Sequence, residues 1–211
     1  MNQITELKFR TENKEEFLPG FAADFPYIAS CAKLDNYPCG YVPWHWHRAV
    51  ELFYMETGAV EYHTPNGKVT VPAGFGGFVN SNVLHMTRPL SRKEKNTQLL
   101  HIFDPSFISG TPGSRIEQNY VLPVTASQKM AFFLFRPDIP VHAEVLEKIR
   151  KAFAFSDREI GYEIKIRESL SEIWLIICEL FQEQPEAETD ITSDRNDERL
   201  KKMMIYIHEH Y

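Results

Sequence analysis

Between residues 50 and 103 the chain consists of short apolar stretches separated by turn residues, and this spacing restricts the fold more than any other feature of the sequence. The stretches are VELFYME, GAVEYHT, KVTVPAG, FGGFV, HMTRP and LLHIFD. Asn66-Gly67, between the second and third, is a typical hairpin turn because both residue types tolerate a positive φ. Many short strands with frequent turns predict a β-sandwich or a small barrel up to about residue 125.

After about residue 125 the apolar residues recur in steps of three and four, which is typical of helices. The first such segment, 141–155, carries Val145, Leu146, Ile149 and Phe153 on one face. The second, 161–183, has a wider apolar stripe: Ile166, Leu170, Ile173, Trp174, Ile176, Ile177, Leu180 and Phe181. A helix this apolar must pack on more than one side, either on the barrel or on a second subunit. The sequence therefore predicts a mainly β domain followed by a helical region.

The net charge of −6 is confined to one segment. Residues 182–198 contain seven acidic residues and one basic residue, so the rest of the chain is neutral. The polar stretch 184–196 reads as an acidic linker. The last segment, 197–211, reads as a helix capped by Asn196 or Asp197, and we expect it to be the first element of a further domain that is truncated here. A neutral body lacks the clustered Lys and Arg of a nucleic-acid site, so no residue of this chain is expected to bind DNA.

The sequence indicates a cytoplasmic protein. No run of about 18 apolar residues exists, which predicts that nothing spans a membrane. The first residues, MNQITELKFRTENKEEF, are too polar for a signal peptide. Cys31, Cys39 and Cys178 have no metal-like spacing, and we expect them to be reduced, inert thiols.

The stretch WHWHRAVE contains the residues that carry most of the functional information. If residues 45–55 form one continuous strand, alternation places His45, His47 and Glu51 on one face, and a further imidazole can come from His85. Three imidazoles and a carboxylate inside a barrel can bind a divalent transition metal. The same groups can hydrogen-bond the hydroxyls of a sugar-like ligand. The residue types alone leave both kinds of site open.

Other polar and aromatic residues of this region are weaker candidates for a ligand-binding role. Trp44 can stack on a sugar face and is the better ligand candidate of the two flanking tryptophans, since Trp46 is expected to pack outside. His63 and His101 lie on predicted strands and are expected to be satisfied structural residues. Arg88 is expected to face the side opposite His85.

Two motifs in this region resemble those of the cupin family. Gly40, His45, His47, Glu51 and Gly58 are similar to the first cupin motif, G-x5-H-x-H-x3,4-E-x6-G, with one residue fewer after the first glycine. The second motif, G-x5-P-x-G-x2-H-x3-N, is less well matched. Its spacing is kept at Gly74, Asn80, Asn82, His85 and Pro89, but the Pro, the second Gly and the final Asn are replaced. Because Asn tolerates the left-handed conformation, the turn at Asn82 can survive.

A wider resemblance covers nearly the whole chain. WHWHRAVELFYMETGAVEYHT, VPAGFGGFVNSNVLHMTRP, EQNYVLPVTAS, GYEIKIRESLSEIWLII and RLKKMMIYIHEHY are similar to the AraC family of bacterial transcription regulators. The resemblance implies a cupin-like (double-stranded β-helix or jelly-roll) sensor barrel with an amino-terminal arm over 1–125 and a helical dimerisation region over 126–183. The acidic linker 184–196 and the first helix of a helix-turn-helix DNA-binding domain, 197–211, would follow.

The function that this resemblance implies is effector sensing by a homodimer rather than catalysis. A small molecule, expected to be carbohydrate-like, would bind near His45, His47, Glu51, His85 and Trp44, with a divalent metal ion as a possible cofactor at the three histidines and Glu51. DNA would be bound only through the missing domain. Two alternatives stay open: a metal-dependent cupin enzyme acting on a small metabolite, and a dimerisation module whose pocket is empty.

Overall fold

The computed structural model describes residues 7–9, 14–127, 130–183 and 203 of the chain. Its strands are β1 (Lys8–Phe9), β2 (Glu16–Phe17), β3 (Tyr27–Lys33), β4 (Val42–His45), β5 (Val50–Thr57), β6 (Ala59–Thr64), β7 (Gly67–Pro72), β8 (Gly76–Val79), β9 (His85–Pro89), β10 (Thr97–Phe103) and β11 (Phe132–Phe135). Its helical segments are η1 (Leu34–Asn36), α1 (Ser106–Ser109), η2 (Glu117–Val121), α2 (Leu122–Thr125), α3 (Pro140–Ala152) and α4 (Tyr162–Glu183).

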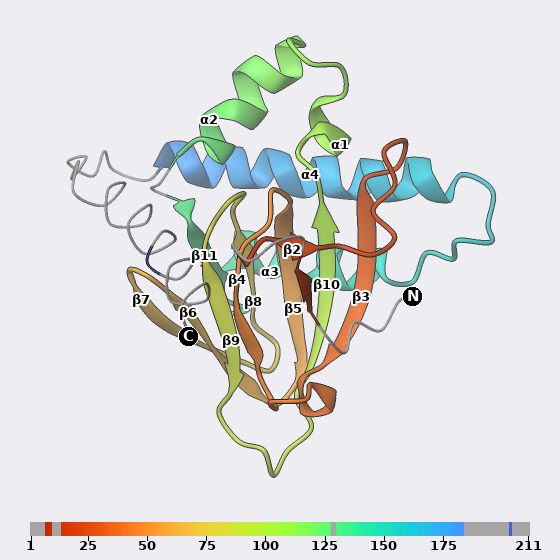
Figure 1. The fold of residues 1–211 in the computed structure, drawn as a ribbon. Helices are drawn as coiled ribbons and strands as arrows, with labels where there is room; N and C mark the ends of the chain where they lie inside the picture. Colours follow the sequence, from red (N-terminus) through yellow and green to blue (C-terminus); the bar gives the residue numbers. More distant parts are fainter. Residues whose placement is uncertain (1–6, 10–13, 128–129, 184–202, 204–211) are drawn as a thin grey trace.

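Two antiparallel sheets form the body of the molecule (Figure 1). One has five strands in the order β11-β8-β5-β10-β3, and the other has four in the order β4-β9-β6-β7. A separate pair, β1-β2, belongs to the amino-terminal arm. The mainly β architecture followed by helices agrees with the fold class predicted from the sequence.

The central strands of the five-stranded sheet are buried on both faces, which explains why they are mainly apolar. Its inner face packs on the four-stranded sheet through residues such as Phe53 and Met55, both fully buried. Its outer face packs on the helices through Leu52 and its neighbours. Every residue of β10 is buried. A strand between two apolar layers loses the polar alternation of a half-exposed strand.

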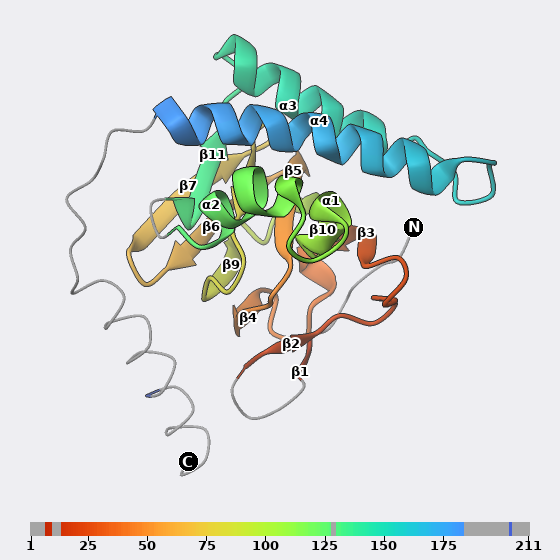
Figure 2. The ribbon, with the colours of Figure 1, turned by 90° about the horizontal axis from the view of Figure 1, so that it is seen from above.

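The helices α3 and α4 lie side by side across the outer face of the five-stranded sheet (Figure 2). Their buried residues include most of the set that the helical spacing predicted: Val145, Leu146, Ile149, Ile166, Leu170, Ile173, Trp174 and Ile177. The other predicted residues of α4, Ile176, Leu180 and Phe181, are only partly buried. Lys148 of α3 and Glu172 of α4 form an ion pair of 2.7 Å. The indole Nε1 of Trp174 donates a hydrogen bond to the carbonyl oxygen of Tyr120, at 3.0 Å, which ties α4 to η2.

The predicted strands of residues 50–103 are all present, but three findings modify the prediction. β11 comes from the stretch expected to be helical, yet it pairs with β8 and extends the barrel sheet. The 45–55 stretch is not one continuous strand, since β4 ends at His45 and β5 begins at Val50. The β6–β7 hairpin is confirmed, although its two loop residues are Pro65 and Asn66 and the positive φ belongs to Gly67.

The remaining expectations concern the termini, the cysteines and the membrane. The linker 184–196 and the helix 197–211 lie almost entirely outside the described residues. Cys31, Cys39 and Cys178 are free thiols, as predicted. Among the helices that the structure describes, none combines the length and apolar character that a membrane crossing needs.

Candidate metal centre

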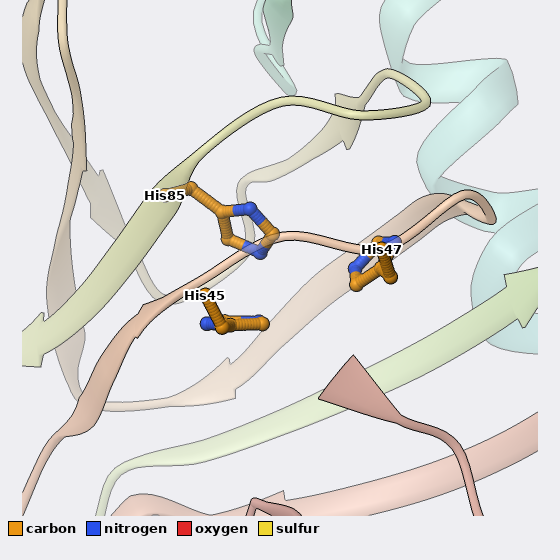
Figure 3. Close-up of side chains that lie close together, drawn as sticks. All are labelled: His45, His47 and His85. Atoms are coloured by element: carbon orange, nitrogen blue, oxygen red, sulfur yellow. The ribbon is translucent and has the colours of Figure 1, made fainter. Parts of the chain in front are cut away.

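Three buried histidines from two neighbouring strands and the loop after β4 converge at one end of the barrel (Figure 3). His45 ends β4 and pairs directly with His85, the first residue of β9. His47 follows in the loop between β4 and β5. One ring nitrogen from each of the three lies within 4.8 Å of the others, and the three residues are only 4%, 2% and 1% exposed, respectively for His45, His47 and His85. The structure thus brings together the three histidines that the sequence pattern predicted to form one cluster.

The backbone fixes the orientation of each ring. The Nδ1 atoms of His45, His47 and His85 lie 2.8, 2.8 and 2.9 Å from the carbonyl oxygens of residues 43, 49 and 83, respectively. A carbonyl oxygen only accepts hydrogen bonds, so each Nδ1 carries a proton, and a ring in its neutral form has its lone pair on Nε2. Hydrogen bonds of this kind from the outer nitrogen are what orients metal-binding histidines in proteins.

The Nε2 atom of His47 is the feature most specific to an ion-binding site. It is buried and has no hydrogen-bond partner among the described residues. Its nearest carboxylate oxygen, Oε2 of Glu51, is 3.8 Å away, which is too long for a hydrogen bond. Buried polar atoms nearly always have a hydrogen-bond partner. A buried nitrogen that lacks one and faces two other imidazoles therefore indicates a cation-binding site.

Glu51 faces the histidines from β5 and is held by its own hydrogen bonds. Its Oε2 atom lies 4.0 Å from Nε2 of His85, and its Oε1 atom accepts a 2.7 Å hydrogen bond from the hydroxyl of Tyr62. That hydroxyl in turn accepts a hydrogen bond from Nε2 of Gln98. Three imidazoles and one carboxylate suit iron, manganese, nickel or zinc. The residue set therefore fits a divalent transition metal.

The electrostatics of the centre favour the metal-binding forms of His45, His85 and Glu51, whereas His47 gains affinity for a proton, which a bound cation would replace. Burial and the neighbouring His47 lower the pKa of His45 to about 3. Burial, together with His45, lowers the pKa of His85 well below its usual range. Although burial opposes its charge, His47 and His85 lower the pKa of Glu51. For His47 burial also opposes the charge, but Glu51 and Glu16 raise its pKa.

Glu16 is the one residue of the centre that the sequence analysis missed. It lies on β2 in the amino-terminal arm and is 5% exposed, and its Oε2 atom is 3.8 Å from Nε2 of His45. Burial raises its pKa to about 7. The sequence gives little signal for it, because Phe17 and Leu18 follow directly and Phe17 looks more like the core residue. In the structure Phe17 is 44% exposed.

The space inside the barrel beside this centre is small. A cavity of about 30 Å³ is lined by residues that include Glu16, His45, Glu51, His85 and Gln98. This volume holds one or two water molecules or an ion, whereas sites for organic ligands typically measure roughly 300–1,000 Å³.

Trp44 is not brought to the centre. It is the neighbour of His45 on a strand, so its side chain faces the other side of the sheet. There it lines a surface pocket of about 420 Å³ with Tyr41, Met86 and Arg88, on the side where Arg88 was expected. His63 forms an ion pair of 3.2 Å with Glu61. His101 is fully buried and bonded to Tyr27, in agreement with a structural role.

The turn between β8 and β9 connects the loop of His47 to the helices. The backbone N–H of Asn82 donates to the carbonyl oxygen of His47 at 2.8 Å, and Oγ of Ser81 donates to that of Arg48 at 2.5 Å. Asn82 has a φ of 62°, the left-handed conformation expected from the motif. On the other side of the turn, Nδ2 of Asn80 donates to the carbonyl oxygen of Val124 in α2 at 2.8 Å.

Comparison with known proteins supports the resemblance seen in the sequence. No protein-family model matches the chain. The chain is similar to the uncharacterized HTH-type transcriptional regulator YdeC of Bacillus subtilis (strain 168), with 23% identity over 202 residues, or 95% of this chain and 67% of that protein. It thus spans about two thirds of the length of this relative.

Among solved structures, apo ToxT from Vibrio cholerae strain SCE256 matches with a TM-score of 0.47 and 11% identity, over 74% of this chain and 57% of that chain. The AraC-like transcriptional activator CuxR matches with a TM-score of 0.43 and 6% identity, over 68% of this chain and 46% of that chain. Cupin proteins match shorter parts of the chain with lower TM-scores. The recognition of a transcription regulator from the sequence agrees with the similarity to the HTH-type transcriptional regulator YdeC.

Proposed function

We propose that this chain is the sensing and dimerisation portion of an AraC-type regulator, and that its sensor site binds a divalent transition-metal ion. The observation that supports the metal is that three buried histidines each place one ring nitrogen within 4.8 Å of the others, and that Nε2 of His47 has no hydrogen-bond partner among the described residues. When bound, the ion would supply the positive charge that holds three neutral rings and the carboxylate of Glu51 in one arrangement.

The small cavity favours an ion over a carbohydrate. A sugar does not fit in about 30 Å³, so the carbohydrate-like effector that the family resemblance implied would need the arm residues Leu7 and Glu16 to leave the cavity that they line. The same argument disfavours the metal-dependent cupin enzyme, because a substrate would have no room beside the ion. We therefore propose a regulatory rather than a catalytic centre.

The hydrogen bonds of the β8–β9 turn supply a path from the centre to the helices. His47 is bonded to Asn82, and Asn80 of the same turn is bonded to Val124 of α2. The segment η2, which precedes α2, accepts the hydrogen bond of Trp174 from α4. We propose that the position of the His47 loop biases the packing of α2 and α4 through these contacts. Such coupling typically amounts to about 1–3 kcal/mol.

The outer face of α4 carries two well-exposed apolar side chains, and we propose that this face pairs two copies of the chain. Ile164 and Leu175 lie three turns apart on this face and are 74% and 54% exposed. Exposed apolar residues that repeat along a helix commonly mark a protein interface. DNA would then be bound by a helix-turn-helix domain beyond this chain, and the intact regulator would act in the cytoplasm.

The experiment that tests this function compares gene expression controlled by the intact regulator and by its His47→Ala variant. Transcripts would be measured by sequencing with and without a cell-permeant chelator. We expect a set of genes whose expression changes on chelation in the wild type and no longer responds in the variant. An equal response of both proteins would contradict a metal sensor at this site.

A further inference from the structure

The amino-terminal arm is fixed to the loop that carries the histidines. The backbone N–H of Glu16 donates to the carbonyl oxygen of Trp46 at 2.8 Å, and the N–H of Trp46 donates to that of Lys14 at 3.2 Å. Residue 46 stands between His45 and His47, so these two hydrogen bonds hold the arm directly over the centre. They also direct the side chain of Glu16 inward, where it is 5% exposed.

Glu16 lines both the interior cavity of the barrel and a pocket on the surface. On the inner side it lines the cavity of about 30 Å³ together with His45, Glu51 and His85. On the outer side it lines a surface pocket of about 240 Å³ that also reaches His47. The outer pocket also carries the carboxylates of Glu15 and Asp104 and the guanidinium of Arg48, which pairs with Glu15 at 3.7 Å. The side chain of Glu16 thus lies at the boundary between the metal centre and the surface.

The close approach of the Glu16 carboxylate to Nε2 of His45 requires a cation or a proton between them. His45 uses its Nδ1 proton on the carbonyl oxygen of residue 43, so its Nε2 presents a lone pair to the carboxylate oxygen 3.8 Å away. Two acceptors that face each other in a buried site are unfavourable unless a cation or a proton lies between them. A metal ion shared with His47 and His85 would satisfy both at once.

We propose that Glu16 is an additional metal ligand, brought to the three histidines by the arm, so that ion binding and docking of the arm form one equilibrium. This inference rests on the proposed metal site and extends it. Because the coupling is reciprocal, the ion stabilises the docked arm and the docked arm strengthens ion binding. Loss of the ion then releases the carboxylate that closes the cavity.

Nickel(II) and manganese(II) serve as probes for this proposal. Binding to the metal-stripped chain would be measured by titration calorimetry for the wild type, Glu16→Gln, Glu16→Asp and the neighbouring control Glu15→Gln, whose parent residue pairs with Arg48 at 3.7 Å. Hydrogen exchange of the peptide spanning residues 14–18 would report docking of the arm with and without the ion.

We expect Glu16→Gln to weaken ion binding by about tenfold or more and to abolish ion-dependent protection of residues 14–18. Glutamine can still bond to Nε2 of His45, so a role limited to that hydrogen bond would leave ion binding unchanged and overturn the proposal. Glu16→Asp should give an intermediate loss, and Glu15→Gln should match the wild type. If the wild type binds but Glu16→Gln binds equally tightly, only this inference fails. If the wild type binds no ion, the metal site itself fails.

Discussion

His45 and His85 face each other across the antiparallel strands β4 and β9, with their ring centroids 4.1 Å apart. Both rings donate Nδ1–H to a carbonyl oxygen two residues earlier in the chain. Two neutral imidazoles held this close, with their Nε2 lone pairs free for a common ligand, are difficult to explain as core packing.

Addition of the metal should stabilise the chain. An ion that binds only the folded state raises the free energy of unfolding by about 2.7 kcal/mol at 100 times its dissociation constant. Urea unfolding with and without nickel(II) measures this effect. His85→Ala should lose the stabilisation, whereas an equal nickel effect in wild type and variant would place the bound ion elsewhere.

The hydrogen bonds of Asn80 should contribute to stability. Asn80 is 1% exposed; its Nδ2 donates to Val124, and its Oδ1 accepts from the N–H of Ser81. Asn80→Ala leaves these buried backbone groups unpaired, which should cost about 1–3 kcal/mol in urea unfolding. Asn82→Gly is the matched control, because glycine adopts a φ of 62° without strain. A cost for Asn80→Ala no greater than that of the control would contradict the proposed link between the turn and α2.

Stability should fall as the pH drops, in part through His101. Its Nδ1 accepts from the hydroxyl of Tyr27 at 2.6 Å and its Nε2 donates to the carbonyl oxygen of Ile149 at 2.9 Å, so an added proton would break the first bond. Burial lowers its pKa from 6.5 to about 4. Between these values the unfolded chain binds more protons than the folded one, so stability decreases with falling pH below about 6.5.

The variant His101→Gln isolates this effect, since glutamine can accept from Tyr27 and donate to Ile149 without titrating. Between pH 8 and pH 5 the wild type should lose about 2 kcal/mol more unfolding free energy than the variant. Urea unfolding at the two pH values measures the difference. Parallel losses in the two proteins would show that His101 takes up its proton equally well in the folded state.

Substitution on the outer face of α4 should separate the dimer. Leu175→Glu places a charge within the proposed interface, where it would be buried without a partner. Analytical ultracentrifugation should find a dimer for the wild type and a monomer for this variant. Leu90→Glu is the control, because Leu90 follows β9 on the barrel and is similarly exposed, at 52% against 54% for Leu175. A wild type that sediments as a monomer at all concentrations would rule out this interface.

Much of the fold was predictable because it depends on local patterns. The strands of residues 50–103 and the helices near 141–155 and 161–183 follow from alternation and from steps of three and four. β11 was missed because the apolar run FFLF has no polar alternation and is too short to distinguish a strand from a helix. Its pairing with β8 is a long-range contact that the local sequence does not encode.

The site was predictable in part. His45, His47 and Glu51 converge as predicted even though the strand is interrupted, because His45 on β4 and Glu51 on β5 line one interior cavity from the two sheets of the barrel. Trp44 was a poor ligand candidate on the alternation rule, since it adjoins His45 on β4. Glu16 could not be predicted, because its place in the centre depends on where the arm docks, and neither Phe17 nor Leu18 indicates that the glutamate faces inward.

The metal content of the purified protein tests the central claim most directly. Plasma mass spectrometry would be applied to untagged wild type and to His47→Ala, with His63→Ala as a control that removes a histidine paired with Glu61 outside the centre. The account predicts about one iron, manganese, nickel or zinc ion per chain in the wild type and in His63→Ala, and none in His47→Ala. A wild type that contains no metal even after reconstitution, or a His47→Ala variant that retains a full complement, would contradict it.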